Sequence, residues 1–375
     1  MAEAKPMIPY GTQTINLKDA NAVLNALTSP FITQGPRVPL FEEAVCTIVG
    51  AKYGVAMNSA TSALHAACVA LDIGPGDLVW TSPISFVASA NCARYCGADV
   101  DFVDTEVDTI NMCPHAFSDK LKRAERKPKA IIVVHMGGFP AYMENIGALA
   151  KAHGIAVIED ASHALGARMG AHLVGSCAYS DITVFSFHPV KMITTGEGGM
   201  AVTNDPELAE KMELFRSHGI VRGFDEPWYY EQQSLGMNYR MTDIAAALGL
   251  SQLERLDDFC GKRHDLAIRY WKNLGGIVGR QYADPHTQPS HHLHLVRIPA
   301  KKRGQVFRHM RDNGIGVQVH YSPIYWHPYY EQLGFKPGLC PEAEDYYFEA
   351  MSLPIFPELE YSDQNFVIET LKKAL

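Results

Sequence analysis

Residues 181–199 have the sequence DITVFSFHPVKMITTGEGG, and this stretch decides the fold of the chain. Its apolar run, Asp181–Phe185, predicts a buried strand that leads to Lys191 among apolar and small residues. Because burial disfavours the charged amine, we expect the pKa of Lys191 to fall, and a neutral amine can form a Schiff base with a carbonyl group. The alternative is a lysine that extends to the surface from a strand end, and Lys191 alone does not decide between the two.

A second apolar run, Ile155–Asp160, ends in acid and is followed by Ala-Ser-His163. The carboxyl end of a parallel strand is where α/β sheets place groups that bind ligands. A pyridinium nitrogen needs such a carboxylate to stay protonated, and a protonated ring is the electron sink of pyridoxal phosphate (PLP) chemistry. PLP chemistry therefore requires both groups, a lysine such as Lys191 for the aldehyde and an aspartate such as Asp160 for the ring nitrogen. The alternative role for Asp160 is to cap a helix, and one residue could do both.

The run Asn58–Leu64 opens a predicted helix with hydroxyl residues and no charge in its first turn, which is the pattern of a phosphate site. Ser/Thr caps begin many helices, so this signal is weak by itself. Ser186 offers a further hydroxyl from the lysine segment. Phe86 is a candidate to stack on a ring, with ordinary core packing as its alternative.

These residues resemble a known family, the sugar-nucleotide aminotransferases among the fold-type I PLP enzymes. Within it the similarity is greatest to the branch of pseudaminic acid biosynthesis, since His163 and Tyr325 stand where many members carry other residues. The matching segments are Phe31–Pro36, Asn58–Leu64, Thr81–Phe86, Glu159–His163, Ser186–Gly199, Arg216–Gly219, Asn238–Thr242 and Gln318–Tyr325.

The resemblance implies a PLP enzyme in which Lys191 carries the cofactor and moves protons, with pyridoxamine phosphate as the intermediate form. It implies that Asp160 holds the ring nitrogen and that His163 lies near the phenolic oxygen. For His163 the alternative is helix packing. The other cofactor-binding residues expected from the residues and the resemblance are Ala60, Thr61, Ser62, Phe86, Ser186 and Asn238.

The resemblance also implies a homodimer with shared active sites, in which Asn238 reaches the partner's cofactor phosphate. The expected reaction is transamination at C4 of UDP-2-acetamido-2,6-dideoxy-β-L-arabino-hexos-4-ulose, with glutamate as the amino donor. For His320, Tyr321 and Tyr325, interface or core packing is the alternative to substrate binding. The residues expected to bind the UDP-linked sugar are Phe31, Gln34, Gly35, Tyr229, Tyr230, His320, Tyr321 and Tyr325.

Short apolar strands alternate with helical patterns from Tyr53 to about Asn204, which predicts an α/β fold with a mostly parallel sheet between helices. We expect strands near 78–81, 100–103, 130–134, 156–159, 182–185 and 200–203. After Met241 the pattern changes to two long helices, 242–256 and 257–274, and then a smaller α+β unit. That unit should contain strands near 292–298 and 316–320 and helices near 303–313, 341–351 and 363–375. We therefore predict a large PLP-binding domain over residues 1–250, including the N-terminal segment, and a small C-terminal domain over 251–375.

Composition narrows the class of protein further. The 375 residues carry a net charge of −8 and include no apolar run of membrane-spanning length, so neither nucleic acid nor a membrane is an expected partner. Eight scattered cysteines without a Cys-x-x-Cys motif, and an N-terminus without a signal-peptide pattern, favour a cytoplasmic enzyme. Three histidines in His291–His294 have no cysteine or carboxylate neighbour, so we expect no metal site.

Several other functions remain to be weighed. PLP-dependent sugar dehydratases of the same family carry histidine at the position of Lys191. A non-catalytic regulator with this fold should have lost cofactor residues that are present here. A nicotinamide dehydrogenase would need a Gly-x-Gly-x-x-Gly motif after an early strand, which the chain lacks. Within the aminotransferases, a D-xylo 4-keto UDP sugar or a 3- or 4-keto dTDP sugar is the alternative substrate.

Overall fold

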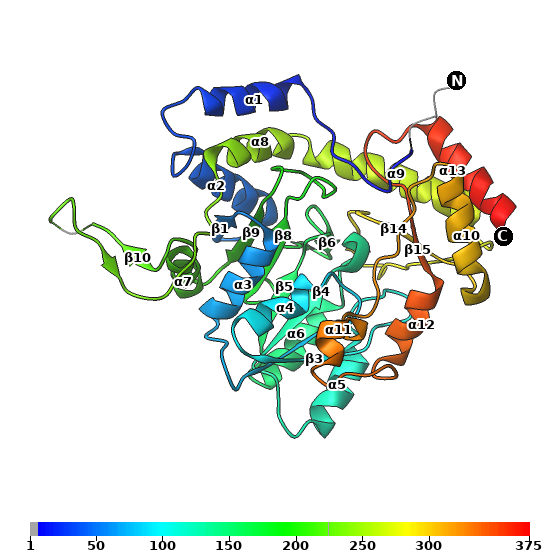
Figure 1. The fold of residues 1–375 in the computed structure, drawn as a ribbon, viewed down its shortest axis with the longest axis horizontal. Helices are drawn as coiled ribbons and strands as arrows, with labels where there is room; N and C mark the ends of the chain where they lie inside the picture. The colour runs from blue at the N-terminus through cyan, green and yellow to red at the C-terminus, as the bar shows by residue number, and fades with distance from the viewer. Residues whose placement is uncertain (1–6, 224) are drawn as a thin grey trace.

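The computed structural model describes residues 7–223 and 225–375. Its centre is a seven-stranded sheet of order β1-β9-β8-β5-β4-β2-β3 (Figure 1). Strands β8, β5, β4, β2 and β3 run parallel, and β9 is antiparallel to both of its neighbours, β8 and β1. The strands are β1 Tyr53–Met57, β2 Leu78–Thr81, β3 Asp99–Phe102, β4 Ala130–Val134, β5 Ala156–Asp160, β8 Ile182–Ser186 and β9 Gly199–Thr203.

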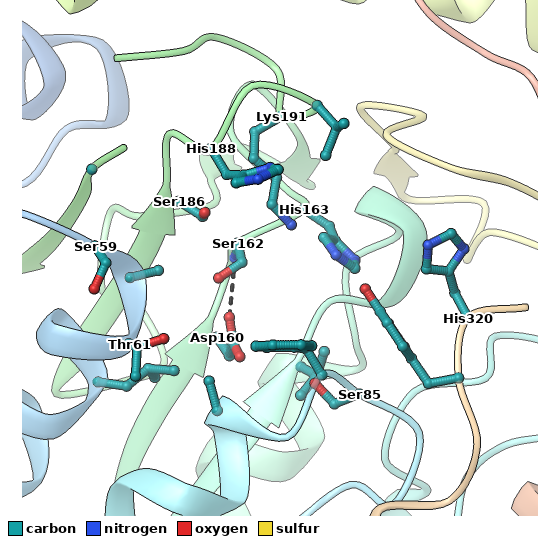
Figure 2. A pocket seen from close by; sticks show the side chains of 18 of the residues that line it. Ser59, Thr61, Ser85, Asp160, Ser162, His163, Ser186, His188, Lys191 and His320 are labelled. Atoms are coloured by element: carbon teal, nitrogen blue, oxygen red, sulfur yellow. Dashed lines mark hydrogen bonds between the residues drawn. The ribbon is translucent and has the colours of Figure 1, made fainter. Parts of the chain in front are cut away.

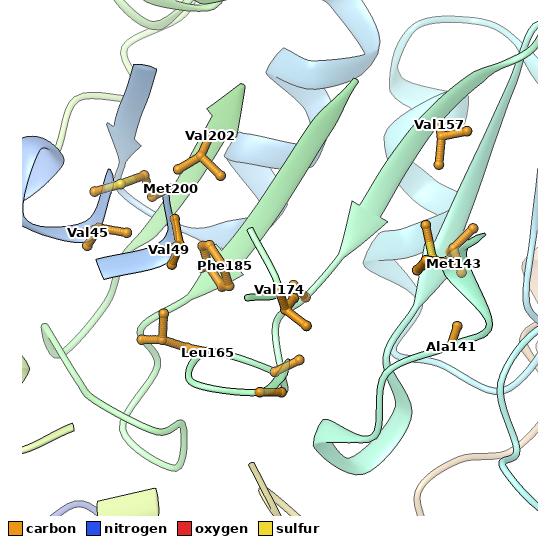
Figure 3. Close-up of a cluster of buried hydrophobic side chains, with 14 of the residues drawn as sticks. Val45, Val49, Ala141, Met143, Val157, Leu165, Val174, Phe185, Met200 and Val202 are labelled. Carbon is orange, nitrogen blue, oxygen red and sulfur yellow. The ribbon is translucent and has the colours of Figure 1, made fainter. Parts of the chain in front are cut away.

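Successive residues of the central strands point to opposite faces, and both faces are buried. Phe185 of β8 joins a cluster with residues of helices on one face, while Val184 joins a second cluster on the other (Figure 3 shows the first). This explains why the strands are apolar almost throughout. The helices that contribute to the first cluster are α2 Arg37–Val49, α5 Pro114–Arg123, α6 Met143–Ala152, α8 Asp243–Leu253 and the start of α9 Leu256–Leu274. Those of the second are α3 Ala60–Ala70, α4 Ala88–Tyr95 and α7 Pro206–Arg216.

The C-terminal part forms its own core around a three-stranded antiparallel sheet, β12-β14-β15. Helix α1, Leu17–Leu27, lies along α8 (Figure 1). The C-terminal elements are α9 Leu256–Leu274, β12 Gly279–Arg280, β14 His294–Arg297, α10 Ala300–Asp312, η2 Ile324–Trp326, α11 Pro328–Glu331, α12 Pro341–Glu349, β15 Ala350–Leu353 and α13 Tyr361–Ala374. The remaining short elements are η1 Met136–Gly138, β6 Arg168–Met169, β7 His172–Leu173, β10 Ile220–Val221, β11 Glu231–Gln232 and β13 Thr287–Gln288.

The predicted α/β fold with a mostly parallel sheet is confirmed, and the six predicted strands of the large sheet are all present. The strand expected over residues 316–320 is wrong. That segment divides its backbone hydrogen bonds between two neighbours, Ile8 on one side and Ser352 on the other, so no continuous ladder forms.

The division at residue 250 remains a prediction, and the structure describes what lies there. Residue 250 falls inside α8, whose buried side chains belong to the large core, and α9 begins only two residues after α8 ends. Within the N-terminal segment, Ile8 is buried in the core of the C-terminal unit, whereas α1 packs along α8. Two hydrogen bonds between segments distant in the sequence hold Ile8 there: Ile8 N donates to the Gly314 carbonyl, and Gly316 N donates to the Ile8 carbonyl.

The Gly-Gly pair at 198–199 lets β9 start directly against the N-terminus of α3. A Cβ atom on Gly199 would lie 2.3 Å from Ala60 N and 2.4 Å from the Ser59 carbonyl carbon. These are backbone atoms, which cannot move aside as a flexible side chain can. The glycine is therefore required for the close approach of a strand to a helix end.

Replacing Gly199 by alanine should destabilise the protein, because the added methyl group overlaps the backbone at Ser59 and Ala60. Overpacking of this kind costs about 1–3 kcal/mol. Gly74→Ala is the matched control, since its Cβ would meet nothing within 4 Å. Urea unfolding of both variants measures the effect, and equal midpoints for the two would contradict the proposed overlap.

Candidate active site

A cavity of about 450 Å³ opens at the carboxyl ends of the parallel strands (Figure 2). Val134 and Asp160 end β4 and β5, and Ser186 ends β8, so three neighbouring strands contribute to its floor. This edge of an open parallel sheet is the usual position for a ligand site. The cavity is also lined by the start of α3, by the segment after β2 and by His320 and Tyr321 of the C-terminal unit.

Asp160 is almost fully buried at the end of β5 and is held from two sides. Its Oδ1 accepts a hydrogen bond of 3.2 Å from the backbone N–H of Ser162. Its Oδ2 accepts one of 2.6 Å from the hydroxyl of Ser89. Ser162 lies in a turn and, among the described residues, no helix begins directly after Asp160, so the carboxylate is not a helix cap; it lines the cavity.

Lys191 lies in the twelve-residue loop between β8 and β9, across the cavity from Asp160 in Figure 2. The loop is tied to itself: Thr195 N and the Thr194 hydroxyl both donate to the carbonyl of Phe187, each at 3.0 Å. Burial lowers the pKa of Lys191 to about 8, against the opposing pull of the Asp160 carboxylate. The amine therefore has a substantial neutral fraction near neutral pH, as the sequence predicted.

The N-terminus of α3 forms one end of the cavity. Ser59 is its N-cap, and the Ser59 hydroxyl accepts from Ser62 N at 3.1 Å. Among the described residues, the N–H groups of Ala60 and Thr61 make no hydrogen bond to the protein. With no acidic residue in the first turn, the positive end of the helix dipole is left for an anion.

His163 lines the cavity near Lys191 (Figure 2). One hydrogen bond indicates which of its two ring nitrogens carries the proton. Nδ1 accepts from the backbone N–H of Gly137 at 3.3 Å, so in the neutral ring the proton lies on Nε2. Burial, with Lys191 as a further cause, holds the pKa of His163 well below its usual value. His163 is therefore a neutral hydrogen-bond donor at physiological pH.

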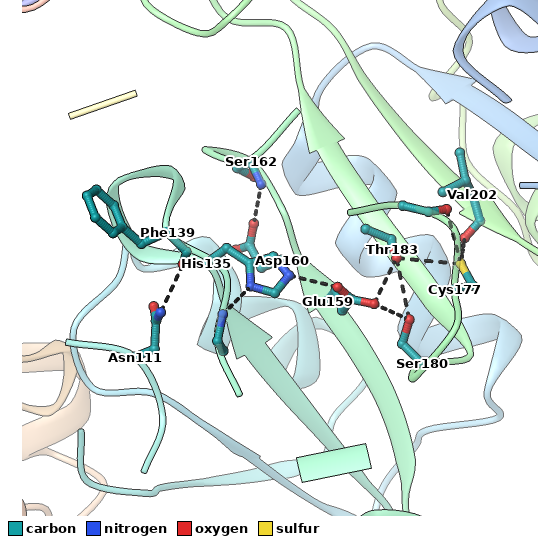
Figure 4. Close-up of polar contacts among 12 residues, drawn as sticks. Asn111, His135, Phe139, Glu159, Asp160, Ser162, Cys177, Ser180, Thr183 and Val202 are labelled. Atoms are coloured by element: carbon teal, nitrogen blue, oxygen red, sulfur yellow. Dashed lines mark hydrogen bonds and ion pairs between the residues drawn. The ribbon is translucent and has the colours of Figure 1, made fainter. Parts of the chain in front are cut away.

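A buried network on the other side of β5 supports the loop that fixes His163 (Figure 4). Glu159 alternates with Asp160 along the strand and faces away from the cavity, where it accepts from His135 Nε2 at 2.7 Å. His135 Nδ1 in turn accepts from Ala141 N at 3.1 Å. These bonds pin both ends of the loop 135–141, and the middle of that loop supplies Gly137 N to His163.

The structure brings most predicted cofactor residues together and leaves others outside. Ser62 does not line the cavity, because its hydroxyl donates to Asn58 Oδ1 at 2.6 Å. Asn238 is exposed and also lies outside it. The predicted cofactor residues that line the cavity are Ala60, Thr61, Phe86, Asp160, His163, Ser186 and Lys191.

Among the predicted substrate residues, only His320 and Tyr321 line the cavity. For Tyr325 the geometry favours the core alternative: the side chain is fully buried, and its hydroxyl donates to Glu344. The other predicted substrate residues, which are exposed or half-buried and lie outside the cavity of their own chain, are Phe31, Gln34, Gly35, Tyr229 and Tyr230.

Sequence reasoning missed several residues of the site. Tyr10 lines the cavity from the N-terminal segment, next to the His320 ring at 5.1 Å between centroids. No local pattern marked it, since its position depends on the pairing of Ile8 with the C-terminal unit. Ser59 could have been found as the cap of the expected helix. The further lining residues that the sequence did not indicate include Ser85, His188 and Glu197.

A lysine of lowered pKa facing a carboxylate, beside a helix N-terminus, is the arrangement that PLP-dependent enzymes use to hold their cofactor. Residues 13–372 match the model of the DegT/DnrJ/EryC1/StrS aminotransferase family, so the chain belongs to that family. Its members are PLP-dependent sugar aminotransferases, and the similar solved structures include one in a PLP form.

Individual relatives match over nearly their whole length. The chain is 38% identical to the spore coat polysaccharide biosynthesis protein SpsC of Bacillus subtilis, over 97% of this chain and 96% of that protein. It is 39% identical to a UDP-4-amino-4,6-dideoxy-N-acetyl-beta-L-altrosamine transaminase of Campylobacter jejuni, covering 98% of each. Helicobacter pylori PseC, an aminotransferase involved in the biosynthesis of pseudoaminic acid, has a TM-score of 0.91 at 34% identity, over 98% of this chain and 99% of that one.

The residues present fit PLP. The unbonded N–H groups of Ala60 and Thr61 suit a phosphate, and Asp160 suits a protonated ring nitrogen. Phe86 is 59% exposed at the cavity wall, which leaves its ring free to cover a flat ligand. Within residues 7–223 and 225–375, no cluster of three potential metal ligands is found, and no helix has the length and apolarity needed to span a membrane.

The lowered pKa of Lys191 predicts how the PLP-free protein reacts with amine reagents. Acetylation of Lys191 by acetic anhydride should rise with pH to a midpoint of about 8, because only the neutral amine reacts. An ordinary lysine has a midpoint of about 10.4. In Asp160→Asn the midpoint should move lower still, because the carboxylate that raises the pKa is gone. Mass spectrometry of the labelled peptide gives the midpoint, and one near 10 would show that Lys191 is solvated.

Proposed function

We propose that this protein transfers an amino group from glutamate to C4 of UDP-2-acetamido-2,6-dideoxy-β-L-arabino-hexos-4-ulose, in pseudaminic acid biosynthesis. The observation that carries the transamination is Lys191 facing Asp160 across the cavity with the start of α3 at one end. The choice of substrate is supported by the similarity to the Campylobacter transaminase, which is named for a UDP-linked 4-amino-4,6-dideoxy sugar, and to PseC, an aminotransferase involved in the biosynthesis of pseudoaminic acid.

In this proposal the chain's own groups hold the cofactor and move one proton. The N–H groups of Ala60 and Thr61 and the Ser186 hydroxyl bind the phosphate, and Asp160 keeps the ring nitrogen protonated. When bound, PLP supplies an electron sink for the negative charge that develops at the reacting carbon. The Nζ of Lys191 takes the proton from Cα of the amino donor, and in the second half-reaction it returns a proton to C4 of the sugar.

Neutral groups around Lys191 keep the amine available as a base. Burial lowers the pKa of His320 to about 4, and the pKa of His163 is also well below its usual value. Neither ring therefore places a second positive charge beside Lys191 at neutral pH. His163 offers its Nε2–H to an oxygen acceptor in the cavity, which fits the expected position beside the phenolic oxygen.

The sugar pocket is proposed at the side of the cavity formed by Tyr10, His320 and Tyr321. His320 is oriented by a 2.7 Å hydrogen bond between its Nδ1 and the hydroxyl of Ser352. Aromatic and imidazole rings suit a sugar with an apolar 6-methyl and an N-acetyl group. One methyl group or one hydrogen bond in such a pocket discriminates by about 1–3 kcal/mol, so related C4 ketones should react slowly.

The substrate proposal predicts a preference among keto sugars. With glutamate, the purified enzyme should aminate the β-L-arabino 4-keto UDP sugar faster than its D-xylo epimer or a 3-keto dTDP sugar. Mass spectrometry of the product and release of 2-oxoglutarate measure the reaction. The Lys191→Ala variant, which lacks the base, is the inactive control. A preference for either competing sugar would overturn the substrate and leave the aminotransferase assignment standing.

We further propose a homodimer in which each chain completes the other's site. Asn238 is exposed and outside its own cavity, although Tyr239 O accepts from Asn58 N close to the start of α3. The hairpin of β10 and β11 extends away from the body in Figure 1, and it carries Trp228, Tyr229 and Tyr230 with 45–78% of their surfaces exposed. A second copy would cover these aromatic side chains and bring Asn238 to the partner's phosphate site.

Mixed dimers test this arrangement. Lys191→Ala subunits mixed with Asn238→Asp subunits should regain activity, because one of the two sites in each mixed dimer then has an intact Lys191 and an intact Asn238. Steady-state turnover of the mixture is compared with that of each parent. If subunit exchange is confirmed and no activity returns, Asn238 serves the site of its own chain.

A further inference from the structure

A chain of two hydroxyl groups runs from the cavity wall to the buried side of Asp160. The hydroxyls of Ser85 and Ser89 lie 2.7 Å apart, and Ser89 lies 2.6 Å from Asp160 Oδ2. All three side chains are buried, and Ser89 is 0% exposed. Ser85 and Asp160 line the cavity, whereas Ser89 stands behind them on α4 and touches no ligand space.

The direction of these hydrogen bonds follows from the number of protons. A carboxylate only accepts, so Ser89 gives its single hydroxyl proton to Asp160. The bond between the two serines must then be donated by Ser85 and accepted by Ser89. Both hydrogen bonds are therefore donated in the same direction, from Ser85 to Ser89 and from Ser89 to the negatively charged carboxylate of Asp160. A charge-assisted bond of this kind is stronger than one between neutral groups, and the bond of Ser85 strengthens it further.

We propose that Ser89 is a positioning residue that fixes the rotamer of Asp160, so that the carboxylate faces the cavity. Two groups donate to the Asp160 carboxylate, and the Ser89 hydroxyl makes the shorter bond, 2.6 Å against 3.2 Å from Ser162 N. With Oδ2 held by Ser89, the carboxylate keeps one orientation toward the cavity. Asp160 is then oriented to accept a hydrogen bond from a protonated ring nitrogen.

This inference rests on the cofactor role of Asp160 and not on the identity of the sugar. The test therefore uses a readout that needs no sugar, which is the affinity of the PLP-free protein for PLP. A substrate different from the proposed one would leave the result unchanged. The measured quantities are the dissociation constant for PLP, and kcat and KM for the amino donor where turnover is available.

The variant Ser89→Ala should bind PLP about tenfold more weakly or worse, because it loses a hydrogen bond to a charged group. Its kcat should fall by a similar factor, with KM for the amino donor nearly unchanged. Ser89→Thr keeps the hydroxyl and should restore most of the affinity. Ser85→Ala removes only the supporting bond and should show a smaller loss than Ser89→Ala.

Ser82→Ala is the matched control. Ser82 is a nearby serine, 1% exposed, and its hydroxyl has no hydrogen-bond partner among the described residues. It should bind PLP like the wild type. Thermal unfolding of the PLP-free proteins separates a loss of fold from a loss of positioning, and Ser89→Ala is expected to unfold within a few degrees of the control. Wild-type PLP affinity in Ser89→Ala, or an equal loss in Ser82→Ala, would overturn the proposal.

Discussion

The site depends on one constraint, which is that the Lys191 amine and the Asp160 carboxylate line the same cavity. Desolvation alone would push the Lys191 amine far toward its neutral form, and the Asp160 carboxylate opposes that shift. The balance leaves a pKa of about 8, where the amine can both carry and give up a proton near neutral pH. The rest of the structure serves to hold these two groups apart, buried and oriented.

The central sheet does this through the alternation of side chains along β5. Asp160 faces the cavity and is bonded by Ser89 and Ser162. Its neighbour Glu159 faces the opposite layer and is bonded by His135, as well as by hydroxyls of Ser180 and Thr183. Both carboxylates are satisfied, so neither is left as an unpaired buried charge. One strand therefore orients the cavity-lining carboxylate of Asp160 and, through the loop 135–141, the ring of His163.

The loop between β8 and β9, which carries Lys191, is anchored at both of its ends. It leaves β8 at Ser186 and enters β9 at Gly199, which are paired across the antiparallel strands. Inside it, the Phe187 carbonyl gathers bonds from two threonines, and the glycines at 198 and 199 let the chain pass close to Thr195 and to the start of α3. The motif thus places the lysine and packs against the proposed phosphate site at the same time.

The sequence by itself determined the sheet strands, the positions of Lys191 and Asp160, and the helix that starts at Ala60, because each rests on a local pattern of apolar residues, caps and glycines. Only the tertiary structure decided the roles of residues whose neighbours are distant in the chain. Tyr10 reaches the cavity because Ile8 pairs with Ile315, while Tyr325 is buried by packing against Phe102, and its hydroxyl donates to Glu344. Ser89 reaches Asp160 from 71 positions away. Local patterns carry no information about such contacts, since the free energy that selects them comes from packing between segments.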